Sequence, residues 1–131
     1  VMISRPQWFL ILGGVNAAIA VALGAAGMHV LRAQLAINDP AGWFDLALQY
    51  HRYHALGLMV VGLAGLRFPS SRWFAWAGAC LLVGIAFFCG GLYWLSLAGS
   101  NQLHAAIPFG GAAFIAAWLL VSIGGVRVAR G

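Results

Sequence analysis

Four runs of apolar residues, separated by short polar segments, dominate the pattern along the chain. The runs cover residues 8–28, 43–66, 73–97 and 108–126. At a rise of about 1.5 Å per residue, a helix needs about 20 residues to cross the hydrocarbon core of a bilayer. The pattern therefore predicts an all-α protein, an integral membrane four-helix bundle, with residues 1–131 forming a single transmembrane domain.

The second run differs from the others because its first half is polar. Uninterrupted apolar sequence covers only residues 55–66, which is too short to span a bilayer, so the preceding segment must be included. That segment carries ionisable and aromatic side chains: Asp45, Tyr50, His51, Arg52, Tyr53 and His54. Counting back from Arg67 places His54 about 20 Å from that end of the helix. Polar groups at such depth need partners or a function.

The composition also indicates a membrane protein. Hydrophobic residues make up 63% of the chain and charged residues 7%, and the mean hydropathy is +0.94, far from the range of soluble domains. The net charge of +5 comes from seven arginines set against Asp39 and Asp45. The arginines stand singly or in pairs without forming a basic helix, so we expect the lipid bilayer, and no nucleic acid, as the partner.

The arginines predict an orientation, because cytoplasmic loops collect positive charge. One side of the expected membrane domain carries five of them: Arg5, Arg67, Arg72, Arg127 and Arg130. The other side carries both aspartates together with Arg32 and, near the start of the second run, Arg52. We therefore expect both termini to be cytoplasmic in a multi-pass protein of the bacterial inner membrane.

This topology brings all four histidines toward the non-cytoplasmic side. His29 ends the first run, His51 and His54 begin the second, and His104 precedes the fourth. Histidines three residues apart share one face of a helix, and Tyr93 lies at the same end of the third run. These positions define a candidate polar cluster or ligand site: His29, His51, His54, Tyr93, Arg52 and Asp45.

The cluster has two interpretations. Imidazoles at this spacing can ligate a metal, pass protons, or bind a haem or quinone headgroup. Alternatively, they hydrogen-bond to neighbouring helices, as intramembrane polar groups commonly do. His51 and His54 supply only two metal ligands, so the second interpretation, hydrogen bonding between helices, is favoured and no cofactor is predicted. Arg52 can pair with Asp45, with Asp39, or with a lipid phosphate.

Motifs of catalysis are missing from the sequence. It contains no GxSxG, no phosphate-binding glycine loop and no HExxH, and two acidic residues leave little for paired-carboxylate chemistry. Cys80 and Cys89 fall on opposite faces of one expected helix and cannot bridge each other. The sequence therefore favours a protein that is not an enzyme.

Eighteen glycines, interspersed with alanines, predict a compact helix packing. Small residues let membrane helices approach closely, and Pro108 suits the first turn of the last helix. We assign helix packing to the following residues: Gly24, Gly27, Gly90, Gly91, Pro108, Gly110 and Gly111. No internal repeat is visible, which argues against a transporter built from paired halves.

Four short motifs, in order, resemble those of the domain of unknown function 423 family, which includes the animal transmembrane protein 256 group. Residues 24–29 (GAAGMH) are similar to its Gly-Ala-x-Gly-Ala-His segment, and residues 50–58 (YHRYHALGL) to Tyr-x-x-x-His-Ala-Leu-Ala-Leu. Residues 88–93 (FCGGLY) resemble Phe-Ser-Gly-Ser-Leu-Tyr, and residues 107–111 (IPFGG) resemble Thr-Pro-x-Gly-Gly. The resemblance implies a four-helix membrane fold and brings no activity with it.

Three functions remain open at this point. The favoured one is a non-enzymatic structural or accessory component of an inner-membrane complex, such as a respiratory complex, in contact with other membrane-protein subunits. The first alternative is a metal-, haem- or quinone-binding protein that uses the histidine cluster. The second alternative is a small transporter or channel.

Overall fold

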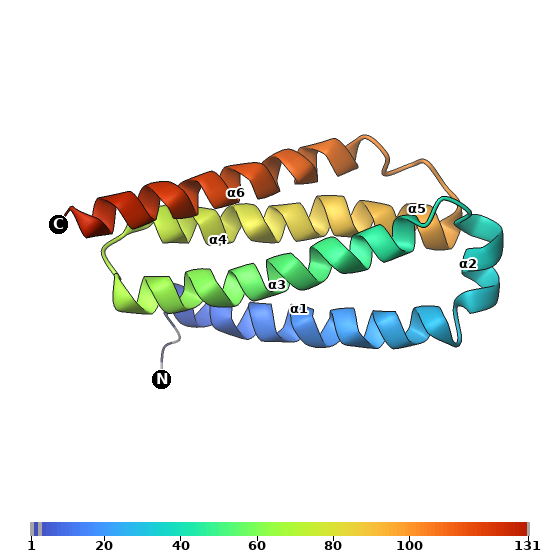
Figure 1. The fold of residues 1–131 in the computed structure, drawn as a ribbon, viewed down its shortest axis with the longest axis horizontal. Coiled ribbons are helices and arrows are strands. Elements are labelled where there is room, and N and C mark those ends of the chain that lie inside the picture. The colour runs from blue at the N-terminus through green and yellow to red at the C-terminus, as the bar shows by residue number, and fades with distance from the viewer. Residues whose placement is uncertain (1, 3, 131) are drawn as a thin grey trace.

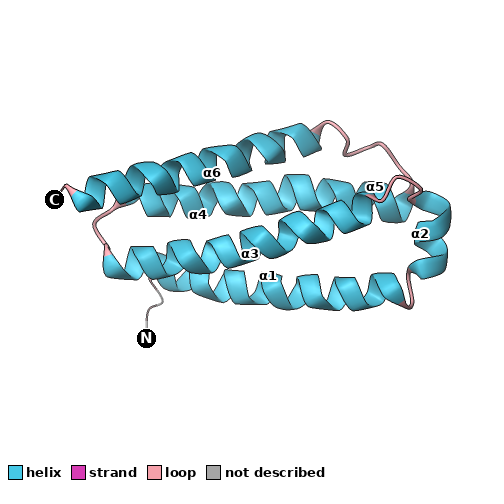
Figure 2. Cartoon of the chain, viewed as in Figure 1, coloured by secondary structure: helices cyan, strands magenta, loops and turns pink. Residues whose placement is uncertain are grey.

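The computed structural model describes residue 2 and residues 4–130, and these residues form helices joined by short turns and loops (Figure 2). In chain order the elements are α1 (Arg5–Met28), α2 (Arg32–Asn38), α3 (Trp43–Arg67), α4 (Arg72–Gly84), the π-helical segment η1 (Ile85–Cys89), α5 (Gly90–Ala98) and α6 (Ala106–Ala129). No strand occurs in this described part of the chain. The all-α class expected from the apolar runs is confirmed.

The long helices lie side by side and alternate in direction (Figure 1). α4, η1 and α5 follow one another as a continuous rod, and α2 lies across the end of the molecule where α3 begins. α1 packs chiefly against α3, while α6 packs against α4 and η1. α3 contacts α1 on one side and the rod on the other, so residues on α3 can reach partners from several elements.

Three helical segments are long and apolar enough to cross a membrane: α1, the rod from Arg72 to Ala98, and α6. α3 has 25 residues, a comparable length, but its first half carries Asp45, His51, Arg52 and His54. These side chains lower its apolar content, which distinguishes α3 from the other three. By their length and composition, these three segments are each able to cross a membrane.

The polar segment between the first two apolar runs, residues 29–42, has no apolar pattern of its own, yet part of it is helical. Two side chains of α2 bind the end of α5: the Gln34 and Asn38 amide groups both donate to the Leu97 carbonyl, at 2.7 Å and 2.8 Å. Beyond α2 the chain turns at residues 40–41, and the Asp39 carboxylate accepts hydrogen bonds from the Trp43 and Phe44 amides at the start of α3.

Buried residues of α3, the rod and α6 form the core. Its members are Leu58, Val61, Phe74, Ala77, Leu81, Cys89, Phe114 and Ala117. Glycines bring the rod and α6 together, because a Cβ at Gly84 would overlap the Phe114 ring and one at Gly110 would overlap the backbone at Phe88. Both cysteines are free, as their positions on one rod require.

The glycines expected to pack helices differ in how tightly they are enclosed. A Cβ at Gly27 would lie 2.6 Å from the Phe44 ring, and one at Gly91 would lie 2.7 Å from the Ile107 side chain. At Gly24 the nearest atom is the Arg52 guanidinium, at 3.1 Å. By contrast, Gly90 and Gly111 have only ordinary contacts, at 3.9 Å and 3.6 Å, and Pro108 is exposed in the first turn of α6.

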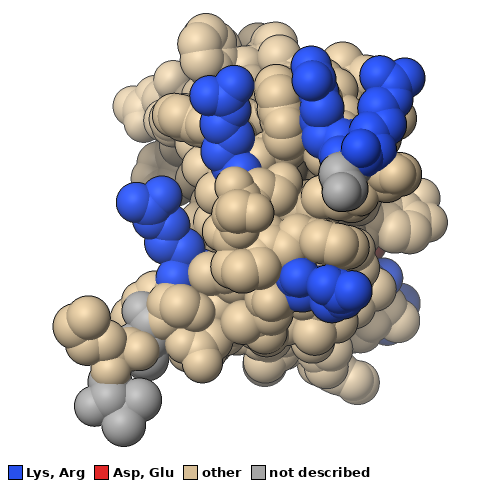
Figure 3. Space-filling view, turned by 90° about the vertical axis from the view of Figure 1, so that its left-hand side faces the viewer, with Lys and Arg blue, Asp and Glu red and all other residues tan. Residues whose placement is uncertain are grey.

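Arginine side chains gather at one end of the molecule (Figure 3). α1 and α4 begin at this end, with Arg5 and Arg72, and α3 and α6 finish there, with Arg67, Arg127 and Arg130. We call the surface that carries these five arginines the arginine end. Asp39 and Asp45 lie at the opposite end, where α3 begins.

Candidate functional site

His51 and His54 are buried on the same face of α3. Their exposed fractions are 4% and 6%, whereas Arg52 and Tyr53 between them are exposed. This alternation follows from helical geometry, which turns residues three apart to one side and the intervening pair outward. α3 therefore presents both imidazoles to the interior, and we call them the histidine pair.

His51 joins α3 to α1 and α5. Its Nε2 lies 3.0 Å from Asn16 Oδ1, and its Nδ1 lies 3.0 Å from the Tyr93 hydroxyl. The Asn16 amide nitrogen donates to the Leu12 carbonyl at 2.8 Å, so the amide oxygen faces the imidazole. His51 must therefore donate from Nε2 and accept the Tyr93 proton at Nδ1.

His54 joins α3 to α6 with the opposite tautomer. The Trp118 indole, which can only donate, lies 3.2 Å from His54 Nε2. His54 Nδ1 then carries the proton and donates to the Tyr50 carbonyl at 2.6 Å, one turn back on α3. Each neutral imidazole thus uses both of its nitrogens.

Aromatic rings surround the His54 side of the pair. The His54 and Phe114 rings are stacked, with centroids 3.5 Å apart and an interplanar angle of 12°. Tyr50 lies 4.6 Å from the Phe88 ring and 5.7 Å from the His54 ring, between centroids. This apolar lining makes each unmade hydrogen bond costly, and it favours satisfied neutral imidazoles.

Of the other members of the expected cluster, Tyr93 joins the pair through His51, whereas His29 and Asp45 do not. His29 is exposed at the end of α1 and Asp45 is exposed in the first turn of α3. His104, the fourth histidine of the chain, is exposed in the loop before α6. Arg52 lies over Gly24 of α1. The expected pairing of Arg52 with Asp45 or Asp39 is not formed among the described residues, and the Asp39 carboxylate caps α3 instead.

Metal chemistry would need ligands that the pair does not offer. Within residue 2 and residues 4–130, no three histidine, cysteine or acidic side chains are grouped so that they could hold an ion. At the pair itself, a metal would have to displace Asn16, Tyr93 or Trp118 from an imidazole nitrogen. Each imidazole instead donates one hydrogen bond and accepts one, and three of the four partners lie on neighbouring helices.

A lateral cleft lies beside His54. Its volume is about 610 Å³, and α3 and α6 form its walls. The lining residues are Leu46, Gln49, Tyr50, Tyr53, His54, Leu56, Gly57, Val60 and Trp118. The cleft therefore gives an apolar molecule access to one edge of the histidine pair.

Two partners of the pair, Asn16 and Trp118, were not predicted, although the sequence contains an indication of each. Asn16 is the one strongly polar side chain in the first apolar run, residues 8–28. A polar side chain surrounded by lipid needs a hydrogen-bond partner within the protein. Trp118 lies in the middle of the last run, away from the helix ends where interfacial tryptophans gather. Both side chains reach an imidazole of the pair, although Trp118 keeps an exposed fraction of 40%.

The relatives of this chain are membrane proteins by name. The UPF0382 membrane protein YwdK of Bacillus subtilis is 39% identical, covering 91% of this chain and 96% of its own. A UPF0382 membrane protein of Staphylococcus epidermidis is 41% identical over 92% of this chain and 97% of its own. The UPF0382 inner membrane protein YgdD of Escherichia coli is 34% identical over 95% and 93%.

The family model described as "Protein of unknown function (DUF423)" matches residues 23–111, which include the histidine pair and Tyr93. No solved structure matches the chain. The resemblance carried by the four motifs is thereby confirmed. With its three apolar helical segments and its membrane-protein relatives, the chain is a multi-pass membrane protein and belongs to the DUF423 family.

Proposed function

We propose that this protein is a non-enzymatic structural or accessory component of an inner-membrane complex, in which the histidine pair holds its own helices together. The observation that carries the proposal is the use of all four imidazole nitrogens. Three of them bind side chains from α1, α5 and α6, and the fourth binds the backbone of α3. Imidazoles so engaged stabilise a fold and leave no free lone pair for chemistry.

The proposal includes a four-helix membrane bundle with both termini in the cytoplasm. α3 supplies the fourth span, since it is as long as α1 and its buried polar groups are bonded to the helices around it. The arginine end faces the cytoplasm by the positive-inside rule. Location in an inner membrane is supported by the Escherichia coli relative YgdD, which is named an inner membrane protein.

A partner surface is available on α1. This helix packs chiefly against α3, so its opposite side faces outward. Gly14, Ala18 and Ala22 are exposed there at intervals of four residues, and a Cβ at Gly14 would meet nothing within 4 Å. Small residues at this spacing let a helix of another subunit approach closely.

Co-purification from native membranes tests the accessory role. Tagged full-length protein, extracted in mild detergent, should carry other membrane subunits that are identified by mass spectrometry. Gly14→Leu should reduce their recovery by about tenfold, equivalent to about 1.4 kcal/mol. Gly125→Leu is the matched control, because Gly125 on α6 also has nothing within 4 Å of a Cβ. Migration of the wild type only as a free monomer or homo-oligomer would contradict the role.

A second candidate function is favoured by the lateral cleft. Its volume of about 610 Å³ falls in the range of small-molecule sites, and Tyr50, Tyr53 and Trp118 line it with aromatic faces. A quinone ring suits such a cleft, with tyrosine hydroxyls as donors to its carbonyl oxygens. Solvent extraction of the purified protein, followed by ultraviolet spectroscopy, should then yield a quinone that Tyr53→Ala loses. An extract free of quinone, from folded protein, would remove this candidate.

A further inference from the structure

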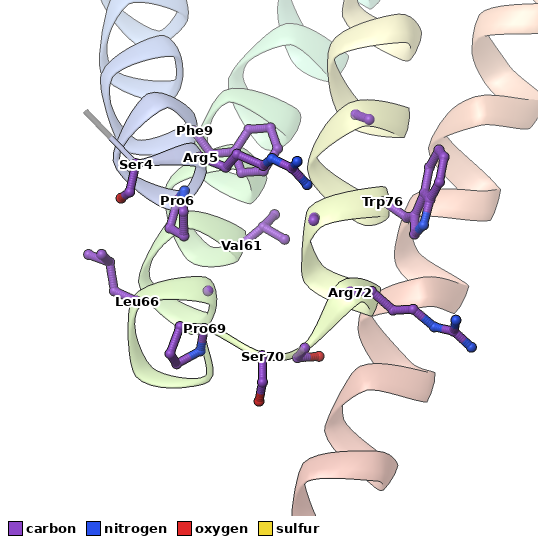
Figure 4. A pocket seen from close by; sticks show the side chains of 14 residues that line it. Ser4, Arg5, Pro6, Phe9, Val61, Leu66, Pro69, Ser70, Arg72 and Trp76 are labelled. Carbon is purple, nitrogen blue, oxygen red and sulfur yellow. The ribbon is translucent and has the colours of Figure 1, made fainter. Parts of the chain in front are cut away.

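A second cavity lies at the arginine end, away from the histidine pair. Its volume is about 710 Å³, and it opens between α1, the end of α3 and the start of α4 (Figure 4). The gap exists because α1 has few contacts with α4, and Phe9 crosses it to rest on Gly78, where a Cβ would lie 2.5 Å from the ring. Phe9 thus separates the cavity from the rest of the α1 and α4 interface.

The walls of this cavity are apolar, while its rim is polar. Phe9, Val61, Leu66 and Ala79 belong to the walls, and Trp76 lies at the edge of α4. The polar members of the lining are Ser4, Arg5, Ser70, Ser71 and Arg72. An apolar wall under a polar rim, with a tryptophan beside it, matches the boundary between the hydrocarbon and headgroup regions of a bilayer.

The charge at the rim is positive and unopposed. Arg5 extends from α1 across the cavity toward α4, whereas Arg72 points away from the cavity and lies over the Trp73 ring (Figure 4). The two acidic residues of the chain lie at the other end of the molecule. The first turn of α4 contains no acidic residue, and its amide groups add a partial positive charge. An anion at the rim would meet no opposing negative charge.

One rim atom lacks a partner. Ser71 Oγ is buried, and it forms no hydrogen bond to any residue that the structure describes. A buried hydroxyl is ordinarily bonded, so its isolation needs an explanation. An acceptor oxygen placed beside Ser71 would satisfy the hydroxyl, and phosphate oxygens are strong acceptors.

We propose that this cavity binds the headgroup of an anionic phospholipid, with Arg5 as the group that attracts its phosphate. The glycerol and the first acyl carbons then cover Phe9, Val61 and Leu66. Free phosphate would leave these apolar walls unfilled, which is why a lipid is the occupant. The site is independent of the histidine pair and of the partner surface on α1.

Lipid retention on purified full-length protein tests the site. Wild-type protein in detergent is incubated with phosphatidylglycerol or phosphatidylcholine of equal chain length, and bound lipid is counted by native mass spectrometry. Phosphatidylglycerol should be retained about fivefold to tenfold better than phosphatidylcholine, because one arginine near a membrane surface contributes about 1 kcal/mol. Millimolar inorganic phosphate should leave the lipid in place.

Three variants localise the effect. Arg5→Gln should abolish the preference for phosphatidylglycerol, and Ala79→Phe should lower retention by filling the cavity without changing the charge. Arg130→Gln is the matched control, since Arg130 lies at the same end and outside the lining. Equal losses in Arg5→Gln and Arg130→Gln would overturn the proposal, as would equal retention of both lipids or displacement by inorganic phosphate. If Ala79→Phe fails to fold, the comparison of the two arginine variants decides.

Discussion

At the scale of single residues, two neighbouring histidines are kept different by what reaches them. His51 meets an amide oxygen that can only accept, so it must donate from Nε2. His54 meets an indole that can only donate, so it must carry its proton on Nδ1. Two histidines on one helix therefore take different tautomers, which are set by a residue on α1 for His51 and by a residue on α6 for His54.

Nitrogen NMR of protein labelled in its imidazole rings tests this assignment. We expect one buried histidine protonated at Nε2 and the other at Nδ1, because His51 faces the Asn16 amide oxygen and His54 faces the Tyr50 carbonyl and the Trp118 indole. Asn16→Leu should remove the constraint on His51, whose other partner, the Tyr93 hydroxyl, can donate or accept, and should leave His54 unchanged. Finding both buried imidazoles in the same tautomer in the wild type would contradict the assignment.

Three members of this hydrogen-bond network, His51, His54 and Tyr93, could be predicted from the sequence. The spacing of His51 and His54 placed them on one face, and Tyr93 was expected at the same end. Sequence reasoning could not pair them with Asn16 and Trp118, because helix register across an interface depends on packing rather than on local pattern. It also placed His29 and Asp45 near the pair, whereas the structure leaves both exposed.

At the scale of elements, glycines decide how closely the rod and α6 pack. Gly110 and Gly111 are neighbours in sequence and differ completely in their surroundings. A Cβ at Gly110 would overlap the Phe88 backbone, and one at Gly111 would make an ordinary contact at 3.6 Å. The π-helical turn at η1 lies at this contact, and such turns accommodate an extra residue within a helix.

The two glycines give a matched pair of substitutions. Gly110→Ala should lower the free energy of unfolding by about 1–3 kcal/mol, the usual cost of overpacking. Gly111→Ala should be neutral or stabilising by up to about 1 kcal/mol, because alanine favours helix over glycine. Reversible unfolding in mixed micelles measures both. Equal effects would show that α6 does not approach the rod as described.

The apolar pattern predicted the long helices well and the short elements poorly. Continuous runs of this length have few alternatives in lipid, so α1 and α6 could be read directly. α2 depends on the Gln34 and Asn38 bonds to Leu97, a contact between segments far apart in sequence. η1 has no local signal that we can identify, since the same residues read equally well as α-helix.

At the scale of the whole molecule, charge is separated along the long axis. Five of the seven arginines lie at one end, whereas both aspartates and Arg32 lie at the other. This asymmetry was visible in the sequence because the arginines follow or precede apolar runs. In a membrane, this charge asymmetry predicts the orientation, because cytoplasmic loops are enriched in positive charge.

Labelling of single cysteines in intact cells tests the orientation. Cys80 and Cys89 are first replaced by alanine, and a cysteine is then introduced at Gln102 or at Arg130, which lie at opposite ends. An impermeant maleimide should label the Gln102→Cys variant at least tenfold faster than the Arg130→Cys variant, because the bilayer shields the cytoplasmic end. Faster labelling at position 130 would reverse the orientation.

We propose that the histidine pair ties the helices together, and a double-mutant cycle between Asn16 and His51 is the sharpest test. The free energy of unfolding is measured for wild type, Asn16→Leu, His51→Leu and the double variant. We expect a coupling energy of about 0.6–1.7 kcal/mol, the range for hydrogen bonds between membrane helices. Strictly additive effects, with no coupling, would show that the pair does not tie the helices.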